Sequence, residues 1–271
     1  MKLIKLLCLL LFVVSCKPKN EDKVVQGCET EAIEFKNKAH ELVYNMVQKV
    51  GTYQDLLNKK DVVYTYTYKT PDGKTDISTE KYLFEGELSY GKYTQHERTF
   101  PKISGAIEQG YDGKEYWLKN EDSVYTDEKS LKIVAFKRPT NFYWFAMFQK
   151  LLDPGLNYEH KGERSIDNNS YDVINVSFTS DNPTDIYQVF INKKTGLVDQ
   201  FLFTVADFGK MDARIMKVEY EKIDGLLIPT KRKYKKSDWN ATIDDKPWIT
   251  VNWTDIKFNN GLTKEDFLLK E

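Results

Sequence analysis

Hydrophobic positions recur with two different periods along the chain. From residue 30 to residue 50 they recur every three or four positions, which predicts an amphipathic helix with Thr30 at its start and Gly51 just past its end. The apolar positions of this stretch are Phe35, Ala39, Leu42, Val43, Met46, Val47 and Val50. Because a single apolar stripe has to be covered, we expect this helix to lie on another element.

Most of the chain after residue 60 follows the two-residue period of β-strands, beginning with the tyrosine-rich run 61–69. Short links such as Asp112-Gly113 and Asp224-Gly225 make neighbouring runs antiparallel. The pattern predicts a mainly β (α+β) fold: a curved antiparallel half-barrel of about ten strands wrapping around helices, with the amphipathic helix N-terminal to it. The later strand-like runs are residues 80–88, 92–99, 107–111, 115–118, 171–178, 186–191, 197–205, 214–222, 226–234 and 248–258.

Residues 140–152 are apolar on every side of a helix rather than along one stripe, and such a helix is buried. Pro139 precedes the segment and Asp153-Pro154-Gly155 follows it, so the segment is too short to span a membrane. One interpretation is a helix buried in the core; the other is a lid or wall of an apolar cavity. Both interpretations place the helix in the hollow of the sheet.

The N-terminal residues have the features of a bacterial lipoprotein signal peptide. Lys2 and Lys5 precede an apolar stretch from residue 6 to residue 14, which is shorter than the roughly 20 residues that span a bilayer. The Val-Val-Ser sequence before Cys16 resembles the lipobox, in which the cysteine is diacylated and becomes the mature N-terminus. The alternative is an ordinary secretory signal followed by an incidental cysteine.

This interpretation sets the expected organisation of the chain. Residues 1–15 form the signal peptide, residues 16–30 form the lipidated cysteine and a flexible tether, and residues 31–271 form a single β domain. We expect a lipid anchor at Cys16 in the cell envelope, on the outer membrane. Cys28 then has no intramolecular partner, so the domain is expected to fold without a disulfide.

Composition and charge exclude several classes of protein. The 271 residues include 40 basic and 41 acidic side chains, whereas a nucleic-acid-binding protein normally carries a basic surplus. Hydrophobic residues make up 41% of the chain, which is typical of a folded soluble domain and excludes a disordered or multi-span chain. The basic run 231–236 favours an edge strand whose charges prevent aggregation, with attraction to anionic lipid head groups as the alternative.

The chain carries none of the common catalytic motifs. Residues 40–44 begin like a zinc metalloprotease motif, but Tyr44 stands where the second histidine must bind the metal. His96 and His160 also have no partner at metal-ligand spacing, and there is no nucleophile elbow, phosphate-binding loop or C-x-x-C motif. We therefore expect no enzyme activity, no metal and no cofactor, and an envelope hydrolase is the least favoured alternative.

A series of short motifs runs in order through the chain: the helix before Gly51, the tyrosine-rich run 61–69, Lys194-Thr195-Gly196-Leu197, Asp224-Gly225-Leu226 with Pro229-Thr230, and Asn260-Gly261 with Asp266-Phe267. In this order the chain resembles the Lol-type superfamily of bacterial lipoprotein carriers and receptors, and more closely bacteroidete envelope lipoproteins that share its half-open β-barrel. The resemblance implies a sheet wrapped around a hydrophobic cavity that holds acyl chains of lipoproteins or glycolipids.

The functional expectation is a membrane-anchored lipoprotein that binds the acyl chain of a lipid or lipoprotein in an aromatic-lined cavity, without chemistry and as a monomer. The alternative is a structural or partner-binding lipoprotein whose core is closed. Strand-face or helix position selects ten residues as the expected lining: Tyr64, Tyr66, Tyr68, Phe142, Trp144, Phe145, Phe148, Phe201, Phe203 and Trp253.

Overall fold

The computed structural model describes residues 33–121, 123–180 and 184–270. Contacts along the chain divide it into residues 1–34 and one compact unit, residues 35–271. The predicted signal peptide, Cys16, Cys28 and Thr30 lie outside the described residues. The four clusters of buried hydrophobic side chains all lie between Ala39 and Phe258, so the compact unit contains its own core.

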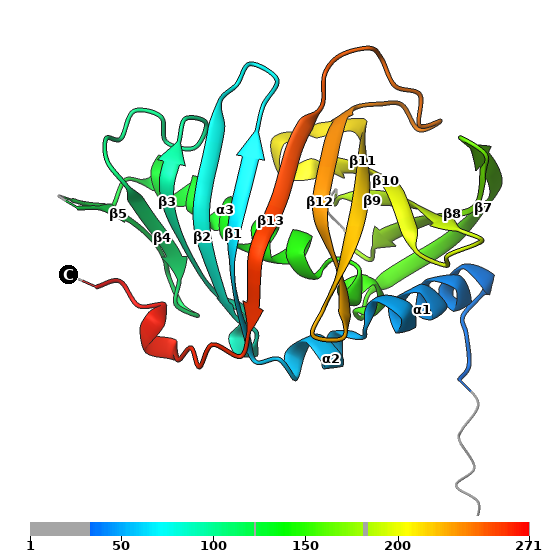
Figure 1. The fold of residues 1–271 in the computed structure, drawn as a ribbon, viewed down its shortest axis with the longest axis horizontal. Helices are drawn as coiled ribbons and strands as arrows, with labels where there is room; N and C mark the ends of the chain where they lie inside the picture. Colours follow the sequence, from blue (N-terminus) through cyan, green and yellow to red (C-terminus); the bar gives the residue numbers. More distant parts are fainter. Residues whose placement is uncertain (1–32, 122, 181–183, 271) are drawn as a thin grey trace, which may run out of the picture. The chain divides into compact units, whose positions relative to one another are not determined.

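One antiparallel sheet of thirteen strands makes up most of this unit (Figure 1). The chain forms two meanders, β1–β6 and β7–β13, and the pairing of β1 with β13 joins them into a single sheet. The strands are β1 Asp61–Lys69, β2 Thr75–Leu83, β3 Leu88–His96, β4 Ile107–Tyr111, β5 Tyr116–Asn120, β6 Val124–Tyr125, β7 Leu156–Ile166, β8 Asn169–Phe178, β9 Ile186–Asn192, β10 Val198–Val205, β11 Lys210–Ile223, β12 Leu226–Lys236 and β13 Ile249–Phe258. The predicted curved antiparallel half-barrel is confirmed, with more strands than expected.

Two strands, β6 and β7, were not predicted from the sequence, and each has a physical reason. β6 has only two residues, and β7 is an edge strand in which most side chains are exposed and polar. β2 begins at Thr75 rather than at residue 80, because its inward positions before the apolar ones are Asp76, Ser78 and Glu80. A strand that buries polar side chains does not show the usual alternation of apolar and polar residues.

Helix α1 (Lys38–Val50) is capped by Asn37, whose side-chain oxygen accepts a hydrogen bond of 2.9 Å from the backbone N–H of His40. The predicted helix included Phe35, which lies before this cap and packs its ring against His40 and Tyr44 instead. The apolar face of α1 lies on the inner side of strands β7–β11, in one cluster of buried residues. The short helix α2 (Tyr53–Leu57) follows it.

Helix α3 (Glu128–Ala146) begins well before the predicted start at residue 140, so that prediction was wrong. Asp127 caps it, with Oδ1 accepting a hydrogen bond of 2.9 Å from the N–H of Ser130. Pro139 lies inside the helix rather than at its start, on an exposed side, and the buried Val134 and Arg138 precede it. Packing of the turn before Pro139 therefore outweighs the cost of about 3 kcal/mol that proline imposes inside a helix.

The inner face of the sheet is the face that carries Val62, Tyr64, Tyr66 and Tyr68 of β1, all of them buried. Helix α3 lies on this face, and the ring of Phe145 stacks on Tyr64 with 4.9 Å between ring centroids (Figure 1). A 3-10 turn, Gln149–Leu152, continues the chain from α3 toward β7. The predicted placement of this aromatic segment in the hollow of the sheet agrees with the structure.

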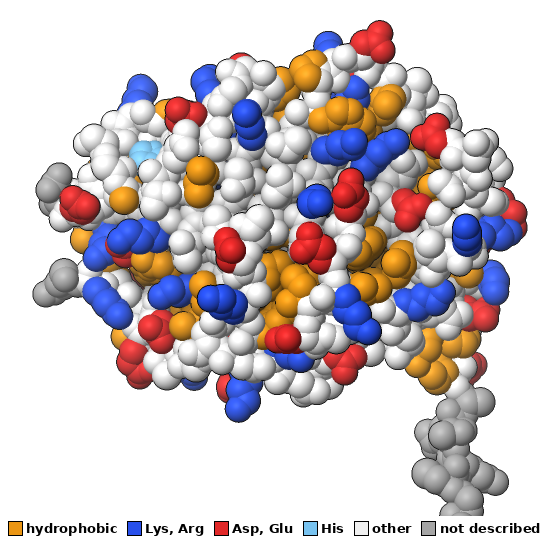
Figure 2. Space-filling model, viewed as in Figure 1, with side chains coloured by type: hydrophobic (Ala, Val, Ile, Leu, Met, Phe, Trp, Pro, Cys, Tyr) orange, Lys and Arg blue, Asp and Glu red, His pale blue; other side chains and the backbone are white. Residues whose placement is uncertain are grey.

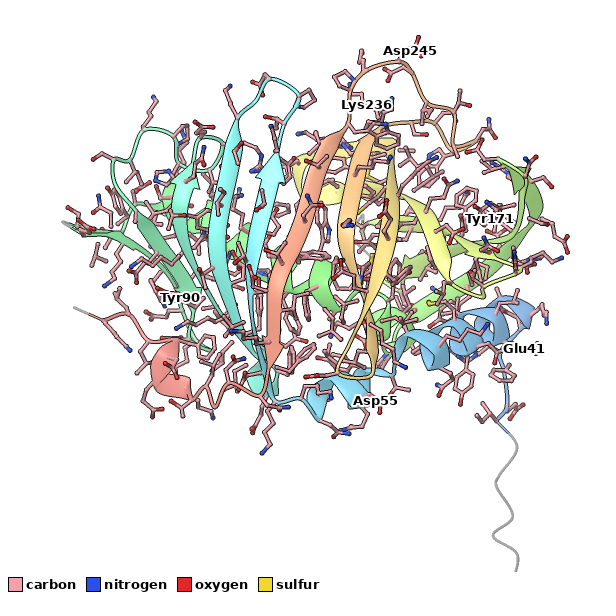
Figure 3. All side chains as sticks on the ribbon, viewed as in Figure 1. Glu41, Asp55, Tyr90, Tyr171, Lys236 and Asp245 are labelled. Carbon is pink, nitrogen blue, oxygen red and sulfur yellow. The ribbon has the colours of Figure 1, made fainter. Side chains whose placement is uncertain are left out.

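The outer face of the sheet carries charges of both signs. In Figure 2, which looks at this face, Lys and Arg side chains alternate with Asp and Glu, and hydrophobic side chains form groups between them. The link between β12 and β13, which runs from Lys236 past Asp245, covers part of the outer face (Figure 3). Its Ala241 and Trp248 pack on a buried cluster of five residues: Tyr171, Val173, Phe190, Leu202 and Ile215.

The basic run 231–236 does not lie at an edge, because β12 pairs with β11 on one side and β13 on the other. The expectation of an edge strand was wrong. Two of its cations are buried on opposite faces of the sheet, Arg232 inward and Lys235 outward. Lys235 Nζ donates to the backbone oxygens of Asp244 and Lys246, and it lies over the ring of Trp248. The run therefore holds the β12–β13 link and helix α3 in place.

Candidate functional site

A cavity of about 580 Å³ lies on the inner face of the sheet, beside helix α3. Its walls come from α3, from β1 and β12, and from the β9–β11 meander. The volume falls within the range of about 300–1,000 Å³ that is usual for small-molecule sites. Ten of its lining residues are aromatic: Tyr66, Tyr68, Phe136, Tyr143, Trp144, Phe178, Tyr187, Phe203, Phe208 and Tyr234.

The aromatic rings on one side of the cavity support one another. Trp144 meets Phe203 and Tyr234 edge-on, with centroid distances of 5.9 and 6.1 Å, and Phe203 lies 5.7 Å from Tyr234. Tyr68 and Tyr234, on β1 and β12, share a hydrogen bond between their hydroxyl groups. Edge-to-face packing of this kind fixes the ring orientations, so this wall is formed before any ligand arrives.

The lining residues that are exposed belong to α3 (Pro139) and to the β10–β11 hairpin (Asp207, Phe208 and Lys210), so the cavity opens between these two elements. Phe208 belongs to the 3-10 turn Ala206–Phe208 of that hairpin, is 56% exposed, and meets the ring of Phe136 edge-on at 4.6 Å. Two aromatic rings from distant parts of the sequence thus bridge the entrance. An exposed aromatic side chain at such a place is a surface on which an apolar ligand gains contact as it enters.

The structure divides the ten expected lining residues into two groups. Tyr66, Tyr68, Trp144 and Phe203 line the cavity. The other six are buried in the two large core clusters and pack against one another without lining it: Tyr64, Phe142, Phe145, Phe148, Phe201 and Trp253. Cys16 lies outside the described residues. The hollow of the sheet is therefore filled over much of its length and open at the end toward the β10–β11 hairpin.

Arg232 is a buried cation that sequence analysis did not single out. Its guanidinium donates to the backbone oxygens of Trp144 and Pro229 and lies 4.2 Å from the ring centroid of Trp253. Burial lowers the pKa of Arg232 to about 9, with Tyr220 and Tyr64 opposing that effect. Within the part of the chain that the structure describes, no carboxylate forms an ion pair with it. Arg232 lies two residues before Tyr234 on the same strand, so the alternation of side chains could have indicated that it faces inward.

A second inward cation, Arg138 of α3, is paired. Its Nη1 lies 2.8 Å from Oε2 of Glu80 on β2, and both side chains are completely buried. The hydroxyls of Ser78 and Tyr82 also donate to Glu80, at 2.6 and 2.9 Å. Although burial lowers the pKa of Arg138, Glu80 raises it, and the pKa ends above its ordinary value. Arg138 and Arg232 together hold α3 to the sheet at two places.

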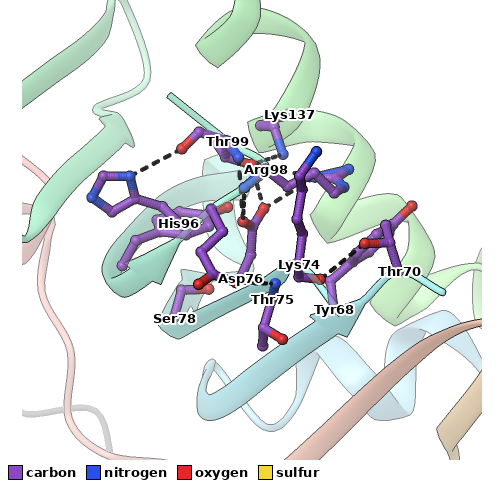
Figure 4. A network of polar contacts seen from close by, with 12 residues as sticks. Tyr68, Thr70, Lys74, Thr75, Asp76, Ser78, His96, Arg98, Thr99 and Lys137 are labelled. Carbon is purple, nitrogen blue, oxygen red and sulfur yellow. Dashed lines mark hydrogen bonds and ion pairs between the residues drawn. The ribbon is translucent and has the colours of Figure 1, made fainter. Parts of the chain in front are cut away.

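A polar network lies where the loop after β3 meets α3 (Figure 4). Asp76 accepts hydrogen bonds from the N–H and side chain of Arg98 and from the N–H and hydroxyl of Thr99, at 2.5–3.2 Å. Lys137 Nζ donates to the same Thr99 hydroxyl at 2.6 Å. The guanidinium carbon of Arg98 lies over Tyr68, 3.7 Å from its ring centroid. Burial raises the pKa of Asp76, but these donors and the two cations bring it below its ordinary value.

The three histidines do not converge. His40 stacks on Tyr158, His96 contacts the backbone oxygens of Thr99 and Gly105, and His160 lies 3.0 Å from Asp172. Among residues 33–121, 123–180 and 184–270, no group of three His, Cys, Asp or Glu side chains is placed to hold a metal ion. Within the same residues, no helix combines the length and the apolar character needed to cross a membrane.

A second hollow, of about 910 Å³, lies at the opposite end of β1 between α2 and the segment after β13. Its lining is mostly polar and contains no aromatic ring, and the backbone N–H groups of Asn260, Gly261 and Leu262 close on the carboxylate of Asp61. The lining of the cavity beside α3 contains ten aromatic side chains and the lining of this hollow contains none, so the aromatic cavity is the candidate site.

No protein-family model and no curated protein matches the chain, but solved structures do. A LolA-superfamily protein from Nitrosomonas europaea is 12% identical, with a TM-score of 0.50, and the match covers 85% of this chain and 97% of that one. A DUF1329 family protein from Desulfovibrio piger and a domain described as outer membrane lipoprotein-sorting from Vibrio parahaemolyticus are also 12% identical. Their TM-scores are 0.48 and 0.46; they cover 84% and 83% of this chain and 95% and 97% of their own.

The chain has the LolA-like half-barrel fold. The first of these matches carries this conclusion, because it extends over almost all of that protein and most of the compact unit described above. At this level of identity the likeness concerns the fold, and function has to be argued from the site. The half-barrel fold that the resemblance to the Lol-type superfamily implies is thus confirmed.

Proposed function

We propose that this protein binds the apolar chain of a lipid in the cavity beside α3 and carries out no chemistry on it. The observation that carries the proposal is the cavity itself, about 580 Å³ on the inner face of the sheet with ten aromatic side chains in its lining. Moving an apolar chain from water into such a site gains about 25 cal/mol for each Å² of apolar surface buried.

The volume of the cavity limits the ligand to one chain. An apolar cavity of about 150 Å³ holds one benzene molecule, so about 580 Å³ holds on the order of twenty heavy atoms. That is the size of a single acyl chain with a small head group. A lipoprotein anchor with several acyl chains would need either a larger opening or only partial insertion, so we favour a single-chain lipid, or one chain of a larger lipid, as the occupant.

The proposal includes the envelope location that the N-terminal sequence predicts. A lipid on Cys16 would tether residues 35–271 near a bilayer, and the intervening residues, fully extended at about 3.5 Å each, would reach on the order of 60 Å. A site on a tether of that length can take up a chain from the same membrane or pass one to a partner beside it. The LolA-like fold supports this role by analogy.

Native mass spectrometry of residues 17–271, purified without detergent from a bacterial cytosol and then offered laurate, tests the proposal. This form omits Cys16 and keeps the whole compact unit with its core. We expect a one-to-one complex with laurate or a co-purified lipid of similar size. A protein that stays ligand-free with laurate in excess would instead support the alternative of a structural lipoprotein with a closed core.

A further inference from the structure

Three cationic side chains meet at one end of the aromatic cavity. Arg98, Lys137 and Arg214 all line it, and each is partly buried; a fourth lining cation, Lys210, is exposed and lies over the ring of Phe208. Only Arg98 has a carboxylate within 4 Å among the described residues. Placing cations in an apolar cavity without enough counter-charge is unfavourable unless something else supplies the negative charge.

Among the described residues, the one carboxylate at this end already accepts hydrogen bonds from neighbouring protein groups. Asp76 accepts four hydrogen bonds from Arg98 and Thr99, and the Thr99 hydroxyl in turn accepts from Arg98 Nη1 at 3.3 Å and from Lys137 Nζ at 2.6 Å. Two cations therefore converge on a single neutral hydroxyl, with one carboxylate behind it (Figure 4). Burial and the neighbouring Arg98 lower the pKa of Lys137 to about 7.

Arg214 approaches the same end from β11. On β11 it is the cross-strand partner of Phe203, which also lines the cavity. Arg98 covers the ring of Tyr68, whose hydroxyl bonds to that of Tyr234, and Arg98 and Arg214 both oppose the rise that burial causes in the pKa of Tyr234. Among the described residues, the hydrogen bond of Arg214 is the one that Nη1 donates to the backbone oxygen of Asp212, at 3.2 Å. The cationic end thus extends from the loop after β3, past two hydroxyl groups, to β11.

The two acidic residues that line the cavity do not neutralise this end. Asp185 accepts hydrogen bonds from the N–H of Ala206 and the hydroxyl of Thr204, on the β9–β10 side, and burial raises its pKa. Asp207 is exposed on the β10–β11 hairpin. Neither forms an ion pair with the cations among the described residues. The cavity therefore combines an aromatic wall with adjoining cations that have few acidic partners among the described residues.

We propose that the ligand is an anionic amphiphile, whose carboxylate or phosphate head group lies against Lys137, Arg98 and Arg214 while its chain lies along Trp144 and Phe203. This inference rests on the proposed function and narrows its ligand class. The head group would accept hydrogen bonds from ammonium and guanidinium donors, which are stronger than those between neutral groups. It would also supply the negative charge that Lys137 and Arg214 lack, since among the described residues only Arg98 is paired with a carboxylate.

The contribution of the head group to the affinity can be measured with four ligands that share a twelve-carbon chain: laurate, dodecyl phosphate, dodecyl maltoside and dodecyltrimethylammonium. Each is titrated into residues 17–271 at pH 7 below its critical micelle concentration, with the tryptophan fluorescence as the signal. We expect the two anions to bind at least about tenfold more tightly than the neutral ligand, and the cation to bind most weakly. Inorganic phosphate without a chain should bind far more weakly than dodecyl phosphate.

Lys137→Met and Arg214→Met should each weaken the binding of laurate and dodecyl phosphate more than the binding of dodecyl maltoside, and so reduce the preference for anions. Lys132→Met is the matched control, because Lys132 is exposed on the same helix and does not line the cavity. Equal affinity for all four ligands would overturn this inference and leave the proposed function standing. If none of the four ligands binds, both this inference and the proposed function are overturned. If inorganic phosphate binds as tightly as dodecyl phosphate, the inference of an amphiphilic ligand is overturned, and the site is one for a free anion.

Discussion

Arg232 of β12 donates a hydrogen bond to the backbone oxygen of Trp144, one of the residues through which helix α3 lines the cavity. The same guanidinium lies over Trp253 of β13 and donates to Pro229. A strand near the middle of the sheet thus holds the last turn of α3 at the distance that leaves the cavity open beside it. The position of α3, and with it the size of the site, depends on a buried cation that has no acidic partner among the described residues.

Arg232→Ala should lower the free energy of unfolding by about 3 kcal/mol, because it leaves a cavity in the core and two carbonyl groups without their donor. Arg232→Met should cost less, since methionine restores part of the volume and removes the cost of burying a charge. Chemical denaturation measures both. Lys231→Ala, at the exposed neighbouring position, should change stability by less than about 0.5 kcal/mol. Equal losses in the alanine and methionine variants would show that hydrogen bonding, rather than packing, makes Arg232 necessary.

Breaking the buried ion pair between Glu80 and Arg138 should destabilise the fold more than the loss of any exposed pair. Glu80→Gln alone or Arg138→Met alone leaves one charge buried without its partner, and each should cost about 3–5 kcal/mol. The double variant should cost less than the sum, because neither charge then remains. Lys92→Met, which breaks the exposed pair with Glu108, is the comparison and should cost at most about 1 kcal/mol. Simple additivity in the double variant would contradict a direct interaction.

Lys137 should make stability depend on pH in a defined window. Its pKa in the folded protein is about 7, below the ordinary value of 10.5, so between these values the unfolded chain binds more protons than the folded one. The contribution of Lys137 to the free energy of unfolding should therefore rise from pH 7 to pH 10.5, and its full cost should be present below pH 7. Urea unfolding at pH 6, 8 and 10 measures the free energy of unfolding of the wild type and of Lys137→Met. The stability of the wild type relative to Lys137→Met should rise with pH over this range. A constant difference, with Lys132→Met as reference, would contradict the lowered pKa.

Phe208 should control how long a ligand stays in the cavity. Phe208→Ala removes the ring that meets Phe136 across the entrance, and we expect ligand dissociation to be several-fold faster. Stability should hardly change, because the side chain is mostly exposed. Stopped-flow displacement of bound laurate gives the rate. Met211→Ala, an exposed apolar residue of β11 that does not line the cavity, is the control, and an equal effect there would argue against a specific role for the entrance.

The fold was predictable from sequence because alternation is a strong signal wherever apolar residues occupy the inner face. The run 61–69 is the clearest case, since its tyrosines lie on the inner face. The signal failed where the inner face is polar. Because Asp76 and Glu80 occupy inward positions, the first half of β2 does not show the alternation of apolar and polar residues. The ion pairs that they form with Arg98 and Arg138 join residues far apart in the chain.

The candidate site was predictable in kind but only partly in its residues. Aromatic side chains on a strand face can either pack against a helix or line a space beside it, and their sequence pattern is the same. Tyr64 and Tyr66 are two residues apart on one strand face; α3 covers Tyr64, whereas Tyr66 lines the cavity. The difference is set by where α3 lies on the sheet, and Arg232 and Arg138, which are distant in sequence, hold the helix there.

The most direct test of the account is to fill the cavity. Ala135 lines it from α3, and Ala135→Trp adds bulk there without removing a hydrogen bond, while Lys132→Trp adds the same side chain on the exposed side of the helix. Native mass spectrometry of residues 17–271 with laurate should give a one-to-one complex for the wild type and for Lys132→Trp, and no complex for a folded Ala135→Trp. An unchanged complex in Ala135→Trp would contradict the claim that the lipid chain is bound between α3 and the inner face of the sheet.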